Sequence, residues 1–145
     1  MIDQYNLQQL ETEEDWVSYH DIRRTILFEG RGHFGIYDPN HPDDRKQDHY
    51  PFLFLYHNQP IGTVRVDVNR SGQSAFMRLV AIIEAEQRKG HGAAMVQFVE
   101  EFALKQACEL MQVVPADDAM AFYRKCGYRI IDPGSDPVIM RKHLV

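Results

Sequence analysis

The sequence predicts an α+β fold, with a mixed and mostly antiparallel sheet flanked by helices. Three strand-like runs between residues 51 and 83 are joined by short turns, which favours antiparallel pairing. A long helical pattern over residues 90–107 separates the third run from the next strand, and a crossover helix makes those two strands parallel. A short helix and two more strand-like runs complete the predicted sheet.

The composition limits the number of domains and the classes of function. The chain has 145 residues, of which 44% are hydrophobic and 26% charged, so we expect one domain over residues 1–145. The net charge of −5 argues against nucleic-acid binding, which favours a basic surface. No apolar run approaches the roughly 20 residues that span a bilayer. Residues 1–4 lack a signal-peptide pattern, so we expect a cytoplasmic protein that does not bind membranes.

The first predicted elements are a strand and a helix. Residues Tyr5–Glu11 alternate weakly and indicate an opening strand. Thr12 is followed by three acidic residues, which indicates a helix start because carboxylates are favourable in the first turn. Apolar and aromatic side chains, Trp16 among them, recur at helical spacing, so the helix should run to about Phe28.

The stretch from Glu29 to Tyr50 predicts a long loop with at most one short helix. Glycines and prolines interrupt it, and histidines and aspartates are scattered through it. The histidine spacing fits no metal-ligand pattern, so we expect no metal. The two cysteines, Cys108 and Cys126, form no CxxC pair, so neither a disulfide framework nor a zinc site is expected.

The central part of the chain predicts the core of the sheet. Pro51–His57 and Ile61–Asp67 are apolar or β-branched runs around a turn, which indicates a hairpin. Ala75–Ile83 is the predicted central strand. The helix Gly90–Ala107 carries one apolar stripe for core packing, and Glu109–Val114 follows it as a strand.

The last predicted elements are a short helix and a hairpin. We expect Pro115–Asp118 to cap a helix over Ala119–Cys126, and Gly127 to end this helix in the left-handed conformation. Tyr128–Ile131 and Val138–His143 should then close the sheet as a hairpin.

The stretch Leu79–Met95 has the features of an anion site, because a buried strand passes through a polar corner into a helix start. Gly90 and Gly92 allow a ligand to approach the backbone, and the first amides of a helix have no carbonyl partner. Arg88 and Lys89 add two charges beside the positive end of the helix dipole. A phosphate would suit this site, and the alternative is an ordinary turn with a solvated basic pair.

Two motifs resemble signatures of the GNAT superfamily of N-acetyltransferases. Gln87–Gly92 (Gln-Arg-Lys-Gly-His-Gly) is similar to the family's Gln/Arg-x-x-Gly-x-Gly/Ala, which follows a strand and opens a long helix. Ala119–Tyr128 resembles the family's late helix, Ala-x-x-Phe/Leu-Tyr-x-Lys-x-Gly-Phe/Tyr. The element order of the whole chain fits the resemblance, and the match is sharp over residues 76–128. The resemblance implies splayed central strands that accept the pantetheine arm of acetyl-CoA.

The same resemblance implies an acyl-CoA-dependent N-acyltransferase that moves acetyl from acetyl-CoA directly to a primary amine of a small molecule or peptide. Tyr123 falls on the family's helical tyrosine, which acts as general acid for the departing thiolate. Backbone groups of Val80, Ala81 and Ile82 would bind the pantetheine and polarise the carbonyl. The residues implied for the phosphates are Gln87, Arg88, Lys89, Gly90, His91, Gly92 and Ala93.

The catalytic base and the acceptor site are marked less clearly. Glutamates that some family members use as the base would fall at Phe76 and Met111. Glu84, Glu29 and a chain of waters remain as alternatives. Glu84 is the candidate base, although it can equally be an exposed carboxylate at the corner. The resemblance also puts the loop over residues 29–50 on the acceptor side, although a solvated polar loop is the alternative. Its candidates for binding a cationic amine are Glu29, Asp43 and Asp44.

A catalytically degenerate sensor or partner domain that only binds acyl-CoA is the alternative function. Ala116 stands where the family often has an asparagine, and no base is assigned. We expect the protein to be a monomer or a homodimer.

Overall fold

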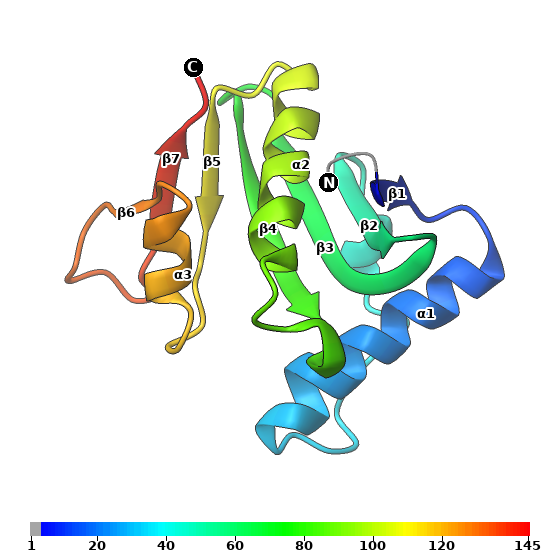
Figure 1. Ribbon diagram of the computed structural model, residues 1–145. Coiled ribbons are helices and arrows are strands. Elements are labelled where there is room, and N and C mark those ends of the chain that lie inside the picture. The colour runs from blue at the N-terminus through cyan, green and yellow to red at the C-terminus, as the bar shows by residue number, and fades with distance from the viewer. Residues whose placement is uncertain (1–3) are drawn as a thin grey trace.

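Seven strands form one mixed sheet, and the computed structural model describes residues 4–145 of the chain (Figure 1). The strands are β1 (Tyr5–Gln9), β2 (His49–Tyr56), β3 (Gln59–Asn69), β4 (Ser74–Ile82), β5 (Leu110–Val113), β6 (Arg129–Ile130) and β7 (Met140–His143). Their order is β1-β2-β3-β4-β5-β7-β6, and only β4 and β5 pair in parallel. The predicted α+β class is confirmed. The sequence prediction for a signal peptide concerned residues 1–4, and residues 1–3 lie outside the described part of the chain.

Three α-helices accompany the sheet in the described residues: α1 (Glu13–Arg23), α2 (His91–Lys105) and α3 (Met120–Lys125). A capping box starts α1, since the Asp15 amide donates to the Thr12 hydroxyl (3.1 Å) and the Thr12 amide donates to the Asp15 carboxylate (3.2 Å). Beyond α1, the helical path continues with changed geometry as a π-helical turn over Arg24–Phe28 and a 3₁₀ turn over Glu29–Arg31. Among residues 4–145, no helix has the length and apolar character needed to cross a membrane.

Alternation along β2 divides the core into two layers. Phe52 and Phe54 point to the layer that packs on α2. Leu53 points to the opposite layer, where it packs with Tyr19 and Ile22 of α1. The helices α1 and α2 therefore cover opposite faces of the sheet, because successive residues of a strand point to opposite sides.

The C-terminal half agrees with the predicted elements except in two details. The strand β7 lies between β5 and β6, so the closing hairpin joins the sheet through its second strand. The predicted cap of α3 is wrong: Ala119 is the N-cap residue and no side chain hydrogen-bonds there. Asp118 is exposed and lies 3.7 Å from Arg31 instead. Gly127 does end the helix in the left-handed region, with φ of 98°.

The strands β4 and β5 pair only over Ser74–Met77 of β4 and then part, as Figure 1 shows. Leu79 has φ of 54°, and the β3–β4 register shifts between Thr63 and Arg65, so β4 carries one extra residue at this point. Such a bulge bends and twists a strand. The remainder of β4, up to Ile82, has no β5 partner. The implied splay of the central strands is therefore confirmed.

Candidate functional site

The turn between β4 and α2 has a strained and well-fixed backbone. A short 3₁₀ turn over Glu84–Glu86 follows β4, and the side-chain amide of Gln87 donates to the Ile82 carbonyl (2.9 Å). Arg88 and Gly90 both have left-handed backbone angles, with φ of 62° and 88°. The Gln87 side chain therefore stabilises the turn, and the positive φ values at Arg88 and Gly90 let the chain reverse into α2.

The first amides of α2 are free to bind an anion. Gly90 is the N-cap residue and no side chain caps the helix. Ala94 is the first residue with an amide that bonds back across one turn, to the Gly90 carbonyl (3.2 Å). The preceding amides, those of His91, Gly92 and Ala93, lack such partners by their position in the helix. A Cβ on Gly90 would meet no heavy atom within 4 Å, so the space beside Gly90 is open, whereas a Cβ on Gly92 would lie 3.3 Å from the Phe122 ring of α3.

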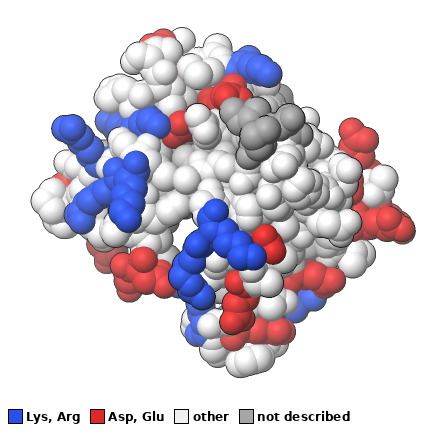
Figure 2. Space-filling model, viewed as in Figure 1, with Lys and Arg blue, Asp and Glu red and all other residues white. Residues whose placement is uncertain are grey.

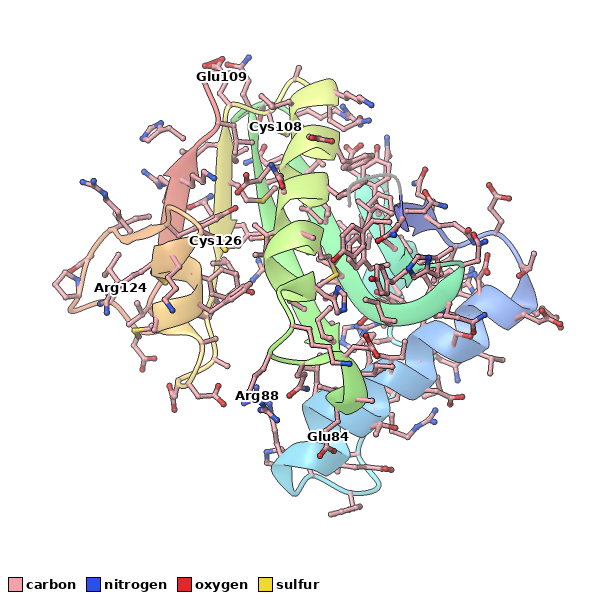
Figure 3. All side chains as sticks on the ribbon, viewed as in Figure 1. Glu84, Arg88, Cys108, Glu109, Arg124 and Cys126 are labelled. Atoms are coloured by element: carbon pink, nitrogen blue, oxygen red, sulfur yellow. The ribbon has the colours of Figure 1, made fainter. Side chains whose placement is uncertain are left out.

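Exposed cations surround this helix start, although the chain is acidic overall. Arg88 and Lys89 are exposed, and Figure 3 shows Arg88 below the start of α2. Figure 2 shows Lys and Arg side chains near the start of α2 and over α3, on the face that carries both helices. Backbone dipole and local cations together favour an anion such as a phosphate at this turn.

The side chain of His91 takes no part in this anion site. Its ring is buried, with Nδ1 2.6 Å from the Tyr5 hydroxyl and Nε2 3.1 Å from a Glu86 carboxylate oxygen. The hydroxyl can donate to Nδ1 while Nε2–H donates to Glu86, so both ring nitrogens have partners. Of the predicted phosphate-binding residues, His91 can therefore contribute its backbone only.

A cavity of about 410 Å³ lies where β4 and β5 part, and we call it the strand-gap cavity. Leu79 and Val80 of β4 line it, as do Ala116 and Tyr123 from the other side. Tyr123 is 4% exposed, and its hydroxyl donates no hydrogen bond within the described chain. Burial raises the pKa of Tyr123, so the phenol keeps its proton at neutral pH.

A second cavity, of about 770 Å³, lies on the α1 face of the sheet, and we call it the α1-side cavity. Its floor comes from β3 and β4, and its walls come from α1, the loop before β2 and the residue after β5. The two cavities share Phe28, Met77, Leu79 and Val114. The two cavities therefore border each other at the bulge of β4.

The structure separates the three acidic residues predicted on the acceptor side. Asp44 is 3% exposed and accepts hydrogen bonds from Arg23 (2.9 Å) and Arg65 (3.2 Å), so its charge is balanced inside the wall. Asp43 lines the α1-side cavity and pairs with Lys46 (2.8 Å).

Glu29 and the candidate base Glu84 line a third depression, between the end of α1 and the β4–α2 turn. Neither residue lines the strand-gap cavity or the α1-side cavity. Figure 3 shows Glu84 beside the end of α1 and away from α3, which carries Tyr123. The structure therefore does not bring Glu84 together with the tyrosine.

Sequence analysis did not identify two residues of the α1-side cavity as candidate site residues, His49 and Arg78. The Nδ1 of His49 lies 2.7 Å from the Asp43 carbonyl, which can only accept, so Nδ1 carries the proton. In the neutral ring Nε2 is then unprotonated and can accept a proton. No motif marks either residue, because their roles depend on which strands become neighbours. Within residues 4–145, no group of three or more His, Cys, Asp or Glu could hold a metal ion.

Known proteins share this architecture. The model of the acetyltransferase (GNAT) family matches residues 5–128. A Bacillus subtilis (strain 168) protein, provisionally named an acetyltransferase, is 25% identical over 130 residues, which cover 86% of this chain and 83% of that protein. A Lactobacillus plantarum structure, provisionally named an N-acetyltransferase, has a TM-score of 0.80 at 20% identity, covering 97% of this chain and 99% of that one. An aminoglycoside 6'-N-acetyltransferase complexed with coenzyme A has a TM-score of 0.75 at 10% identity, with 97% of both chains covered.

Proposed function

Because the chain belongs to the acetyltransferase (GNAT) family, we propose that it transfers acetyl from acetyl-CoA directly to a primary amine of a small molecule or peptide. The family match confirms the resemblance seen in two motifs, and this family uses acetyl-CoA. One observation carries the proposal for this chain: the strand-gap cavity and the α1-side cavity share four lining residues around Leu79, and the uncapped start of α2 lies against α3, which carries Tyr123.

Three parts of the chain would hold the CoA thioester. The amides from Arg88 to Ala93 suit the pyrophosphate, because they combine free donors with a helix dipole. The edge of β4 over Val80–Ile82 has no β5 partner, so its backbone groups can pair with the amide-bearing pantetheine arm. The strand-gap cavity, with Tyr123 in its wall, would receive the thioester itself.

The reaction forms a C–N bond between the amine and the thioester carbonyl and breaks the C–S bond. Backbone donors beside the Leu79 bulge would stabilise the negative charge that develops on the carbonyl oxygen. The phenol of Tyr123 would donate a hydrogen bond to the departing sulfur. The amine must lose a proton, and water in the α1-side cavity can carry it to the free Nε2 of His49.

Acceptor-dependent release of CoA tests the proposal. We would measure free thiol with acetyl-CoA and a panel of amines, amino acids, peptides and polyamines, and measure acetyl-CoA binding by calorimetry. CoA production that depends on one class of amine supports acyl transfer. Tight binding of acetyl-CoA without CoA production from any amine would instead support the degenerate binding domain. Ala116 in the strand-gap cavity is compatible with that alternative, as is the lack of a glutamate among the described residues that line this cavity.

A further inference from the structure

We propose that the acceptor amine carries a carboxylate, and that Arg78 on the floor of the α1-side cavity binds this carboxylate. The inference rests on the acyl transfer proposed above and names the class of acceptor. It depends on the charges of the cavity, on the geometry of Arg78 and on its place in β4.

The buried charges of the cavity balance one another. Arg23 and Arg65 each donate to Asp44, and Arg65 also donates to both oxygens of Asp67 (2.7 and 3.0 Å). Two guanidinium groups are thus matched by two carboxylates, and all four side chains are at most 15% exposed. These residues form the wall and floor, and their charges offset one another. Arg23 donates to Asp44 through Nη1 alone, and its buried Nε has no hydrogen-bond partner among the described residues.

Arg78 is the cation left over on this floor. Its nearest acidic contact is long, with Nε 3.5 Å from an Asp67 oxygen that already accepts from Arg65. Within the described residues, the guanidinium of Arg78 donates no hydrogen bond that meets the usual distance and angle limits. The side chain is 38% exposed and lines the cavity.

The guanidinium of Arg78 packs over an aromatic ring. Its central carbon lies 4.1 Å from the centre of the Phe76 ring, which shares the α1 face of β4. Stacking on an aromatic ring leaves the N–H edges of an arginine free. A planar fork with free N–H groups matches a carboxylate and can bind both of its oxygens.

The place of Arg78 limits the size of the acceptor. It precedes Leu79, one of the four residues at which the two cavities meet. Arg78 and these shared residues line one cavity of about 770 Å³, so a carboxylate at Arg78 and an amine near Leu79 can belong to one small molecule. The matching chemical class is an amino acid with a free carboxylate. The two acids at the rim do not pair with Arg78, because Asp43 pairs with Lys46 and Asp38 accepts the Asn40 amide in the exposed loop.

Matched acceptors test the inference. CoA release would be measured with glycine, β-alanine and the common α-amino acids, each beside its carboxamide, and with propylamine and spermidine. We expect at least one amino acid to exceed its carboxamide in kcat/KM by about tenfold or more. The amine of a carboxamide is less basic and more often neutral, so amine ionisation biases the comparison against the inference.

Two outcomes overturn the inference in different ways. If carboxamides, propylamine or spermidine are used as well as the amino acids, acyl transfer stands and the assigned carboxylate does not. If no amine releases CoA although acetyl-CoA binds, the proposed function itself has failed and the inference falls with it.

Variants then tie the preference to one side chain. Arg78→Gln should raise KM for the preferred amino acid about 10- to 100-fold, the value of a charged hydrogen bond, with KM for the carboxamide nearly unchanged. Arg78→Lys should restore part of the loss, because it keeps the charge without the fork. Arg129→Gln is the control, since it removes an exposed charge on β6 outside both cavities. Equal losses for acid and carboxamide in Arg78→Gln would show that Arg78 only supports the fold.

Discussion

Replacing Tyr123 by phenylalanine isolates the one side-chain group to which the proposed chemistry assigns a role at the sulfur. The ring is 4% exposed and packs against Phe122 and Tyr128. Its hydroxyl lies beside the strand-gap cavity and forms no hydrogen bond within residues 4–145. Phenylalanine therefore keeps the packing and removes only a donor that is unused in the absence of substrate.

The expected magnitude follows from proton affinities. A thiol ordinarily loses its proton about 1.5 pH units below a phenol, so full transfer from tyrosine to a thiolate is uphill by about 2 kcal/mol. Burial raises the pKa of Tyr123 and increases that difference. The phenol should therefore act mainly as a hydrogen-bond donor to the leaving sulfur, and a hydrogen bond to a charged atom contributes about 1.5–3 kcal/mol. In Tyr123→Phe, kcat should fall about 10- to 150-fold.

Tyr128 supplies the matched control for this experiment. It is also buried, but its hydroxyl donates to a Glu100 carboxylate oxygen (2.7 Å) and lies outside both cavities. Tyr128→Phe should lower the melting temperature and spare kcat, whereas Tyr123→Phe should lower kcat and spare acetyl-CoA affinity and the melting temperature. Steady-state kinetics, calorimetry and thermal melts measure the contrast. Unchanged kcat in Tyr123→Phe would refute the role of the phenol, and a loss of affinity larger than the loss of kcat would make Tyr123 a packing residue of the cofactor site.

Three further perturbations test the site and the fold. Gly90→Val should abolish acetyl-CoA binding in calorimetry. Gly32→Val is the control, because Gly32 has a similar φ of 82° and equally open space at its Cβ; this variant should have the same backbone strain and still bind acetyl-CoA. Equal affinities in the two variants would refute the anion site. Asp44→Asn should destabilise the fold by about 3–5 kcal/mol, because it leaves buried arginines without their carboxylate. Asp43→Asn should leave the urea midpoint nearly unchanged, because the pair of Asp43 with Lys46 is solvated. Similar urea midpoints in the two variants would contradict this. Burial lowers the pKa of His20, so the unfolded chain binds a proton first as pH falls below about 6.5, and stability declines there by up to about 1.4 kcal/mol per pH unit. His20→Gln should flatten this decline in urea titrations, and an unchanged slope would assign it to other groups.

The elements of the fold could be predicted because they depend on local pattern. Alternation and β-branched residues mark β2 to β4, and the helical stripe of α2 fixes the parallel strand that follows. The prediction of an anion site also rests on local pattern, since Gly90 and the basic residues before it lie within one turn of chain. The positive φ of Leu79 could not, because nothing in a branched apolar residue favours the left-handed region.

The acidic loop shows where sequence reasoning ends. Asp43 and Asp44 are neighbours in a polar stretch, and composition alone treats them alike. The fold brings Arg23 of α1 and Arg65 of β3 to the same point, 21 residues away on either side of Asp44, so one aspartate is buried and the other stays at the rim. Local sequence pattern cannot predict an ion pair between residues far apart in the chain. The candidate residues for binding the acceptor therefore change from the loop acids to Arg78 of the sheet.

The bulge at Leu79 links the fold to the site more directly than any single side chain. Before it, Arg78 pairs with Arg65 on the α1 face; after it, Ala81 pairs with Thr63 and joins the α1 face, where a regular strand would have placed Val80. The small Ala81 side chain packs with the α1-side layer, while Leu79 and Val80 both line the gap that β5 has left. One inserted residue thus accompanies the gap in which we propose that the thioester binds, and two consecutive residues line that gap. The arginine before it stays on the floor from which the proposed acceptor would approach.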